Sequence, residues 1–337
     1  MFSGQSSVPS LLSVLILFLA CILGCKATAP APSWTKTKLL AQNEDHPSKI
    51  IADGSFIYFV TGAGTIAAKN EGTNNIKRLS LKDGAASVLV KGGEHFPSDA
   101  LAVDEKFLYW SDGGTILRVP KTGGESEAVV SDAPGSPAEM VVDSENIYWL
   151  IWSGGEKAHP VPVMFAPKKG GAAKQLAPPQ IGANGICLDR DSVYWTTPGG
   201  IKKAPKIGGD ATFVFENPAQ WPTTGLISDA ENFYYAQMNN KGHSVLMKLS
   251  KKGGAPTQIA PAINHTFEFV ADDTSIYYFD DEPGGGMIGT VALRKVSKSG
   301  GDPMMLDHGQ PGWVKYIAVD KTQVYFTDIG NVYSLPK

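Results

Sequence analysis

An aspartate, four residues and then a tyrosine form a short pattern that recurs along this chain. We count seven copies: Asp53/Tyr58, Asp104/Tyr109, Asp143/Tyr148, Asp189/Tyr194, Asp229/Tyr234, Asp272/Tyr277 and Asp320/Tyr325. Successive tyrosines are 51, 39, 46, 40, 43 and 48 residues apart. A period of this length is typical of propeller blades and similar repeat units. The repeat therefore predicts an array of small units, each built to the same plan.

One repeat divides into four short apolar runs, each bounded by Gly, Pro, Asp or Ser. In the second repeat these runs are 100–103, 107–110, 116–119 and 127–130. Runs of this length between turn residues are typical of short β-strands. The second run is apolar at consecutive positions, as expected where neighbouring units cover both faces of a sheet. Each repeat is therefore predicted to be a four-stranded propeller blade.

The turns also repeat, and they carry one lysine per blade. The third run ends in Pro120-Lys121-Thr122-Gly123-Gly124, and similar turns follow in later repeats. We interpret the lysines as solvated turn residues, with a rim for anionic headgroups or polysaccharide as the alternative; they are Lys82, Lys121, Lys168, Lys206, Lys251, Lys298 and Lys337. The motif aspartates are predicted to accept hydrogen bonds within their own turns. A metal would need them to converge, whereas a ring of seven blades holds them apart.

The two ends of the repeat array complement each other. The last repeat reaches Leu335-Pro336-Lys337 before a fourth strand, and residues 35–41 resemble the fourth strand at 173–177. A blade shared by both ends leaves no open sheet edge. The predicted fold is therefore all-β: a seven-bladed β-propeller over residues 35–337, closed by pairing of its N- and C-terminal strands.

The first residues predict export and a lipid anchor. The run 11–23 is almost wholly apolar, too short to cross a hydrocarbon core of roughly 30 Å as a helix but suited to a secretory signal. Ile22-Leu23-Gly24-Cys25 follows, and it resembles the lipobox of bacterial lipoproteins. The resemblance implies a signal peptide at 1–24, an acylated Cys25 and a tether at 25–34. The alternative is a secreted protein cleaved after Ala29. Cys187 is then the other remaining thiol, and we interpret it as a core residue.

Two segments resemble a known repeat. Tyr109-Trp110-Ser111-Asp112 and Tyr325-Phe326-Thr327-Asp328 are similar to the YWTD repeat of low-density-lipoprotein-receptor propellers, and similar repeats occur in secreted bacterial propellers. The receptor propellers have six blades, whereas seven repeats are counted here. The resemblance implies a binding role in preference to catalysis, and it names no ligand.

The two faces of such a ring differ in their loops. The turns between strands one and two and between strands three and four share one face, where they are short and uniform. The other face carries the longer, variable loops, where binding usually occurs. The candidate binding face therefore consists of His46, His95, Asp99, Glu139, Trp152, His159, Asn184, Trp221, Thr224, His265, Glu268 and Trp313.

Polar residues precede the first strand of each repeat, where the chain enters the centre of the ring. They are Lys49, Asp99, Glu139, Asn184, Thr224, Glu268 and Lys315. A funnel lined with His, Trp and mixed charges suits a polar small molecule, a glycan or a peptide. The expected function is a lipid-anchored binding or scaffolding module of the bacterial cell envelope, at the outer membrane or its periplasmic face.

The alternative function is a lyase or hydrolase of the propeller type. His95, Glu139 and His265 would then act as acid and base, although no motif singles them out. No catalytic residue, metal ligand or cofactor is therefore assigned from the sequence. A net charge of −3 gives no basis for nucleic-acid binding.

Overall fold

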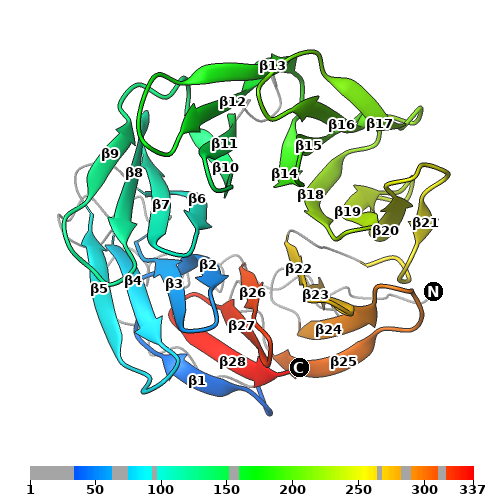
Figure 1. The fold of residues 1–337 in the computed structure, drawn as a ribbon. Coiled ribbons are helices and arrows are strands. Elements are labelled where there is room, and N and C mark those ends of the chain that lie inside the picture. Colours follow the sequence, from blue (N-terminus) through cyan, green and yellow to red (C-terminus); the bar gives the residue numbers. More distant parts are fainter. Residues whose placement is uncertain are drawn as a thin grey trace, which may run out of the picture. The chain divides into compact units, whose positions relative to one another are not determined.

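The computed structural model describes residues 34–62, 75–92, 97–151, 159–263, 268–281, 290–309 and 316–337. In this part of the chain the regular structure consists of strands, which form seven four-stranded sheets. The sheets are arranged as the blades of a seven-bladed β-propeller (Figure 1). The predicted fold class is confirmed.

The first four blades follow one another along the chain. Blade 1 contains β2 (Ser48–Ala52), β3 (Phe56–Val60), β4 (Asn75–Ser80) and β5 (Ala86–Lys91). Blade 2 contains β6 (Pro97–Val103), β7 (Phe107–Asp112), β8 (Thr115–Pro120) and β9 (Glu127–Val130). Blade 3 contains β10 (Pro137–Val142), β11 (Asn146–Ile151), β12 (Val161–Pro167) and β13 (Lys174–Gln180). Blade 4 contains β14 (Asn184–Leu188), β15 (Ser192–Thr197), β16 (Gly200–Pro205) and β17 (Thr212–Glu216).

The remaining three blades complete the ring. Blade 5 contains β18 (Thr223–Ser228), β19 (Asn232–Met238), β20 (Ser244–Ser250) and β21 (Thr257–Gln258). Blade 6 contains β22 (Phe269–Ala271), β23 (Ser275–Asp281), β24 (Val291–Ser297) and β25 (Met304–Gly309). Blade 7 contains β26 (Ile317–Val319), β27 (Gln323–Thr327) and β28 (Val332–Pro336), and β1 (Lys38–Ala41) supplies its fourth strand.

Blade 7 closes the ring with strands from both ends of the sequence. Strand β1 pairs antiparallel with β28, placing Lys38 opposite Ser334 and Leu39 opposite Tyr333. Figure 1 shows the two strands side by side at the outer edge of the blade. The predicted pairing of the terminal strands is therefore confirmed.

The core consists of seven apolar clusters, and each contains aromatic residues from two successive blades. Adjacent strand residues point to opposite faces of a sheet, so the motif tyrosine and the aromatic after it enter different clusters. Tyr148 shares a cluster with Trp195 of the next blade, whereas Trp149 packs with Tyr109 of the preceding blade. The other five junctions repeat this arrangement. The consecutive apolar residues of the second strand thus follow from burial on both faces.

The motif aspartate organises the turn before this strand. Oδ1 of Asp104 accepts the main-chain N–H groups of Lys106 and Phe107, both at 2.8 Å, and Oδ2 accepts the hydroxyl of Tyr109 at 2.9 Å. All seven motif tyrosines donate to their aspartates in this way. The interpretation of these aspartates as turn acceptors is confirmed.

Candidate functional site

Three charged side chains gather at the inner edge of the ring. Lys49, Glu139 and Glu268 each lie four residues before a motif aspartate, on or next to the innermost strands of blades 1, 3 and 6. Nζ of Lys49 lies 3.0 Å from Oε1 of Glu268, although blade 7 separates their two blades (Figure 1). Such a pair can form only across the inside of the ring. These three residues constitute the inner-ring site.

Both glutamates also bind the main chain of the following blade. Oε2 of Glu139 accepts the N–H of Ile186 at 3.2 Å, and Oε2 of Glu268 accepts the N–H of Ile317 at 3.4 Å. Ile186 and Ile317 occupy the same place in their blades, three residues before the motif aspartate. In the described part of the chain, the second carboxylate oxygen of Glu139 has no protein partner. That oxygen is available to a ligand.

The environment of Glu268 disfavours its negative charge. Burial raises the pKa of this carboxyl above its ordinary value, and the nearby charge of Glu139 acts in the same direction. Lys49 and the N–H of Ile317 oppose the rise without cancelling it. The side chain still exposes 24% of its surface, so it remains accessible from the centre of the ring. A cationic or hydrogen-bond-donating ligand would therefore relieve the unfavourable charge.

The same place in blades 4 and 5 holds glycine, one residue after the Asn184 and Thr224 named from the sequence. The inner strands bulge here, and Gly185 and Gly225 both take a φ of 61°. A Cβ on Gly185 would lie 2.4 Å from the main chain of Gly225, so no larger residue fits. This side of the ring is thus lined by closely packed backbone, and the charges lie elsewhere.

The other predicted binding-face residues are dispersed. His46 lies in the linker between β1 and β2, with Nδ1 2.8 Å from Oδ1 of Asp45. His159 and Asn184 are exposed, and Trp221 and Thr224 are partly buried. In the described part of the chain, no hydrogen bond or ion pair joins these side chains to either glutamate. Outside the described residues lie His95, Trp152, His265 and Trp313, together with the side chain of Asp99.

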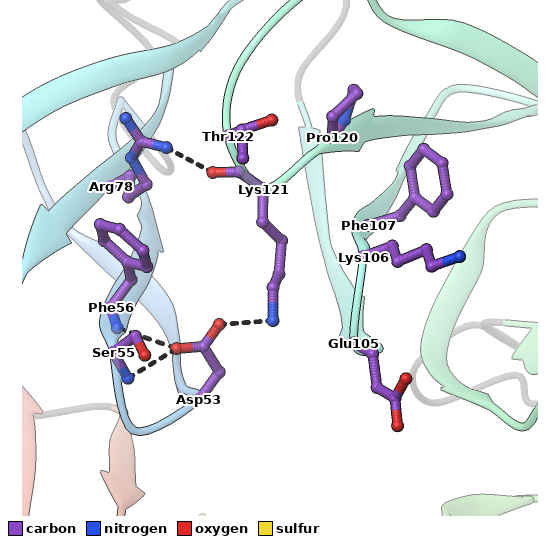
Figure 2. A pocket seen from close by; sticks show the side chains of 10 residues that line it. All are labelled: Asp53, Ser55, Phe56, Arg78, Glu105, Lys106, Phe107, Pro120, Lys121 and Thr122. Atoms are coloured by element: carbon purple, nitrogen blue, oxygen red, sulfur yellow. Dashed lines mark hydrogen bonds and ion pairs between the residues drawn. The ribbon is translucent and has the colours of Figure 1, made fainter.

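The opposite face carries a ring of ion pairs between blades. The turn lysine of one blade reaches the motif aspartate of the preceding blade, as with Lys121 Nζ and Asp53 Oδ2 at 2.8 Å (Figure 2). We call this set the lysine girdle; it comprises Lys121–Asp53, Lys168–Asp104, Lys206–Asp143, Lys251–Asp189, Lys298–Asp229 and Lys337–Asp272. These lysine side chains are only 12–20% exposed. Their interpretation as solvated turn residues was wrong, because the motif aspartates neutralise them.

The girdle has a different residue at the junction of blades 7 and 1. The N–H of Leu81 donates to the carbonyl of Ser55 at 3.0 Å, as the N–H of Lys121 does to Lys106 in blade 2. Leu81 therefore occupies the girdle position in blade 1, and the predicted Lys82 lies one residue later and is exposed. Within the described residues, the carboxylate of Asp320 in blade 7 has no lysine partner. Leu81 instead packs against the cluster that contains Tyr325.

Among the described residues, no three His, Cys, Asp or Glu side chains are grouped as a metal site would require. None of them forms a helix long and apolar enough to cross a membrane. Burial raises the pKa of the Cys187 thiol to about 12, and the residue packs with the apolar cluster between blades 4 and 5. Cys187 is therefore a partly buried residue packed against the core, and its raised pKa disfavours the thiolate that a reactive cysteine needs.

Comparison with solved structures finds other propellers at low sequence identity. The WD40 propeller domain of Doa1 is 12% identical with a TM-score of 0.59, over 90% of this chain and 98% of that one. Puromycin hydrolase is 15% identical with a TM-score of 0.62, over 88% of this chain and 53% of that one. The extracellular domain of the hybrid two-component system BT4673 from B. thetaiotaomicron is 11% identical with a TM-score of 0.63, over 90% and 40%.

The seven four-stranded sheets define the class of protein, a seven-bladed β-propeller, and the similarities agree with this fold. At such identities they show the fold alone. This chain spans about half of the hydrolase and two fifths of the BT4673 chain. No protein-family model matches the sequence, and no curated protein matches it.

Proposed function

We propose that this protein is a binding or scaffolding propeller, anchored by lipid in the bacterial cell envelope, which takes its ligand at the inner-ring site and the loops around it. The observation that carries the proposal is the convergence of Lys49, Glu139 and Glu268 inside the ring. Three blades contribute one charge each, and the Lys49–Glu268 pair joins two blades that are not neighbours in the ring. Charges held by separate strands of a rigid scaffold form a preorganised polar site.

The chemistry of the site favours a ligand that donates hydrogen bonds or carries positive charge. Glu139 has a carboxylate oxygen without a protein partner in the described part of the chain, and the pKa of Glu268 is raised. An ammonium group or a set of hydroxyls would satisfy these acceptors. A basic peptide segment or a glycan is therefore the expected ligand class, and the predicted His and Trp residues of the surrounding loops would supply further contacts.

The anchor is proposed from the sequence alone. The apolar run 11–23, whose end overlaps Ile22–Cys25, resembles a lipoprotein signal with Cys25 as the acylated residue. An acylated cysteine with several chains attaches stably to a membrane, whereas a single chain binds marginally. Replacing Cys25 with Ser should leave the precursor unprocessed or move the protein to the soluble fraction. Unchanged membrane partitioning, with a mature N-terminus at Pro30, would support the secreted alternative.

The binding proposal is tested by capture from an envelope extract on the immobilised protein. The test variant carries Glu139→Gln and Glu268→Gln, which keep the shape of both side chains and remove their charge. The control variant carries Lys82→Ser, Lys169→Ser and Lys252→Ser, which are exposed turn lysines outside the girdle. A species retained by the wild type and the control but lost from the test variant supports the proposal. A species lost only from the control would place the binding on the opposite face.

One observation favours the enzyme alternative. A carboxyl with a raised pKa beside a second carboxylate is a frequent arrangement in acid–base catalysis, and Glu268 and Glu139 interact in this way. The similarity to puromycin hydrolase shows the fold alone and adds no evidence for hydrolysis. Chemical change in the captured ligand on incubation with the wild type, but not with the Glu139→Gln, Glu268→Gln variant, would favour a lyase or hydrolase.

A further inference from the structure

A hollow of about 780 Å³ lies on the girdle face, between blades 1 and 2. Its volume is within the usual range of small-molecule pockets. Phe56 and Arg78 line it from blade 1, and Phe107 and Pro120 line it from blade 2. Figure 2 shows Lys121 extending between these two groups toward Asp53. The hollow is separate from the inner-ring site, and ligand binding there is independent of the proposed function.

Arg78 provides this hollow with a positive charge that has no acidic partner in the described part of the chain. Its guanidinium carbon lies 4.8 Å from the ring centroid of Phe56, and Nη1 donates to the main-chain carbonyl of Lys121. The other charged side chains that line the hollow are two lysines and two carboxylates. Lys121 is paired with Asp53, while Glu105 and Lys106 carry opposite charges. The remaining guanidinium N–H groups are therefore available to an anion.

Blade 2 contains the same arrangement with its charge neutralised. The guanidinium carbon of Arg118 lies 4.5 Å from the ring centroid of Phe107, and Nη1 donates to the carbonyl of Lys168 at 2.8 Å. Glu127 lies opposite Arg118 on the neighbouring strand and accepts from its Nε at 2.6 Å. The residue opposite Arg78 is Ser87, which is exposed. Blade 1 thus has a serine at the strand position where blade 2 has the carboxylate that pairs with its arginine.

We propose that the hollow binds a small organic anion that carries a carboxylate on an apolar or aromatic body. The planar guanidinium matches a carboxylate with two parallel hydrogen bonds. Phe56 and Phe107 both line the hollow and offer apolar surface to the rest of the ligand. Recognition therefore requires both parts of the molecule, and neither the charge nor the ring alone is sufficient.

Phenylacetate is the probe, titrated into the full chain by isothermal calorimetry. Phenylethanol lacks the charge and acetate lacks the ring, and each should bind about tenfold more weakly or not at all. Inorganic phosphate tests whether any anion suffices. Saturable binding of phenylacetate above these three compounds supports the proposal. Equal binding of phenylethanol or phosphate overturns it, as does the absence of phenylacetate binding.

Two substitutions outside the hollow locate the site without removing Arg78. Ser87→Glu supplies the partner that Arg118 already has, so it should weaken phenylacetate binding about tenfold while leaving thermal stability unchanged or higher. Ser87→Gln is the matched neutral control and should bind as the wild type does. Arg78→Gln should weaken binding to a similar extent, whereas Arg118→Gln should leave it unchanged. Wild-type affinity in Ser87→Glu, or equal losses in both arginine variants, would overturn the proposal.

Discussion

Lys168 of blade 3 binds Asp104 of blade 2, and the same ammonium group donates to the main-chain carbonyl of Asp143 in its own blade at 2.9 Å. It also lies 5.5 Å from the ring centroid of Tyr109, whose hydroxyl binds the same Asp104. One lysine thus connects two blades through a carboxylate that already organises a turn. Lys337 repeats this arrangement with Asp272 and the carbonyl of Asp320.

Breaking this contact should destabilise the ring. Lys168→Met keeps most of the apolar stem and removes the charge, leaving the half-buried Asp104 without its cation. The side chain of Lys168 is 14% exposed and that of Asp104 is 18% exposed, so the pair lies between the surface and the core. We expect the free energy of unfolding to fall by about 2 kcal/mol, measured by urea denaturation. Lys169→Met is the control: this neighbouring lysine is exposed, and its loss should change stability by less than about 0.5 kcal/mol. Equal effects would mean that the girdle contributes nothing.

The sequence predicts those features of the fold that involve residues close together along the chain. The turn aspartate, its two N–H donors and the motif tyrosine lie within five residues, so the repeat shows them directly. Another pair of the same spacing, Asp328 and Tyr333, makes the same contact at 2.7 Å in a different turn. Asp273 and Tyr278 also have this spacing, but the hydroxyl of Tyr278 is buried without a hydrogen bond in the described part of the chain. The spacing alone therefore identifies neither the hydrogen bond nor the blade, and the period of the repeat is needed as well.

Features that depend on long separations were not predictable from the pattern. Lys168 and Asp104 are 64 residues apart, and nothing in either turn names the other. The predicted funnel residues stand at two positions relative to the motif aspartate: Lys49, Glu139 and Glu268 precede it by four residues, whereas Asn184 and Thr224 precede it by five. The strand pairing shifts at this place in blades 1, 3, 4 and 5, and such a shift cannot be read from the repeat. That Ser87 and not a carboxylate lies opposite Arg78 follows from the pairing of β4 with β5, which only the strand register supplies.

The junction of blades 7 and 1 allows the girdle to be completed. Leu81→Lys would place a lysine beside Asp320, at the cost of the apolar contact that Leu81 makes near Tyr325. The two effects separate in a double-mutant cycle with Asp320→Asn. We expect Leu81→Lys to be about 1 kcal/mol less harmful in the wild type than in the Asp320→Asn background. Thermal and urea unfolding provide the measurement. A coupling energy near zero would show that the new lysine does not reach Asp320.

Ring closure also depends on Trp34, the last residue of the predicted tether 25–34. Its side chain is 9% exposed and its ring centroid lies 4.8 Å from that of Phe326. The indole lies directly against Gly309, where an added Cβ would come within 2.6 Å of it. Trp34→Ala should therefore destabilise the fold by about 3 kcal/mol, whereas Leu39→Ala, at a side chain 40% exposed, should cost under about 1 kcal/mol.

Deleting whole segments tests the same closure more severely. Removal of residues 34–41 takes away β1 and Trp34, exposing the edge of β28, and should produce aggregation on heating. Removal of residues 26–32, which lie outside the described part of the chain, is predicted to leave the unfolding temperature unchanged. Light scattering during a thermal scan distinguishes the two. Identical scans would contradict a closing role for the first segment.

The girdle aspartates should make the stability of this protein depend on acid. Burial alone would raise the pKa of Asp104, but the hydrogen bonds from Lys168, Phe107, Lys106 and Tyr109 lower it to about 2. The unfolded chain, with a pKa near 3.8, therefore binds more protons than the folded chain between these two values. The stabilisation is fully present above the unfolded pKa and is lost as pH falls toward about 2.

Asp104→Asn removes this contribution, so the difference in unfolding free energy between wild type and variant should be constant near neutral pH and shrink below about pH 4. Urea unfolding across this range measures it, with Asp132→Asn, an exposed aspartate outside the girdle, as the control. A difference that stays constant down to about pH 2 would show that the charge of Asp104 does not stabilise the fold.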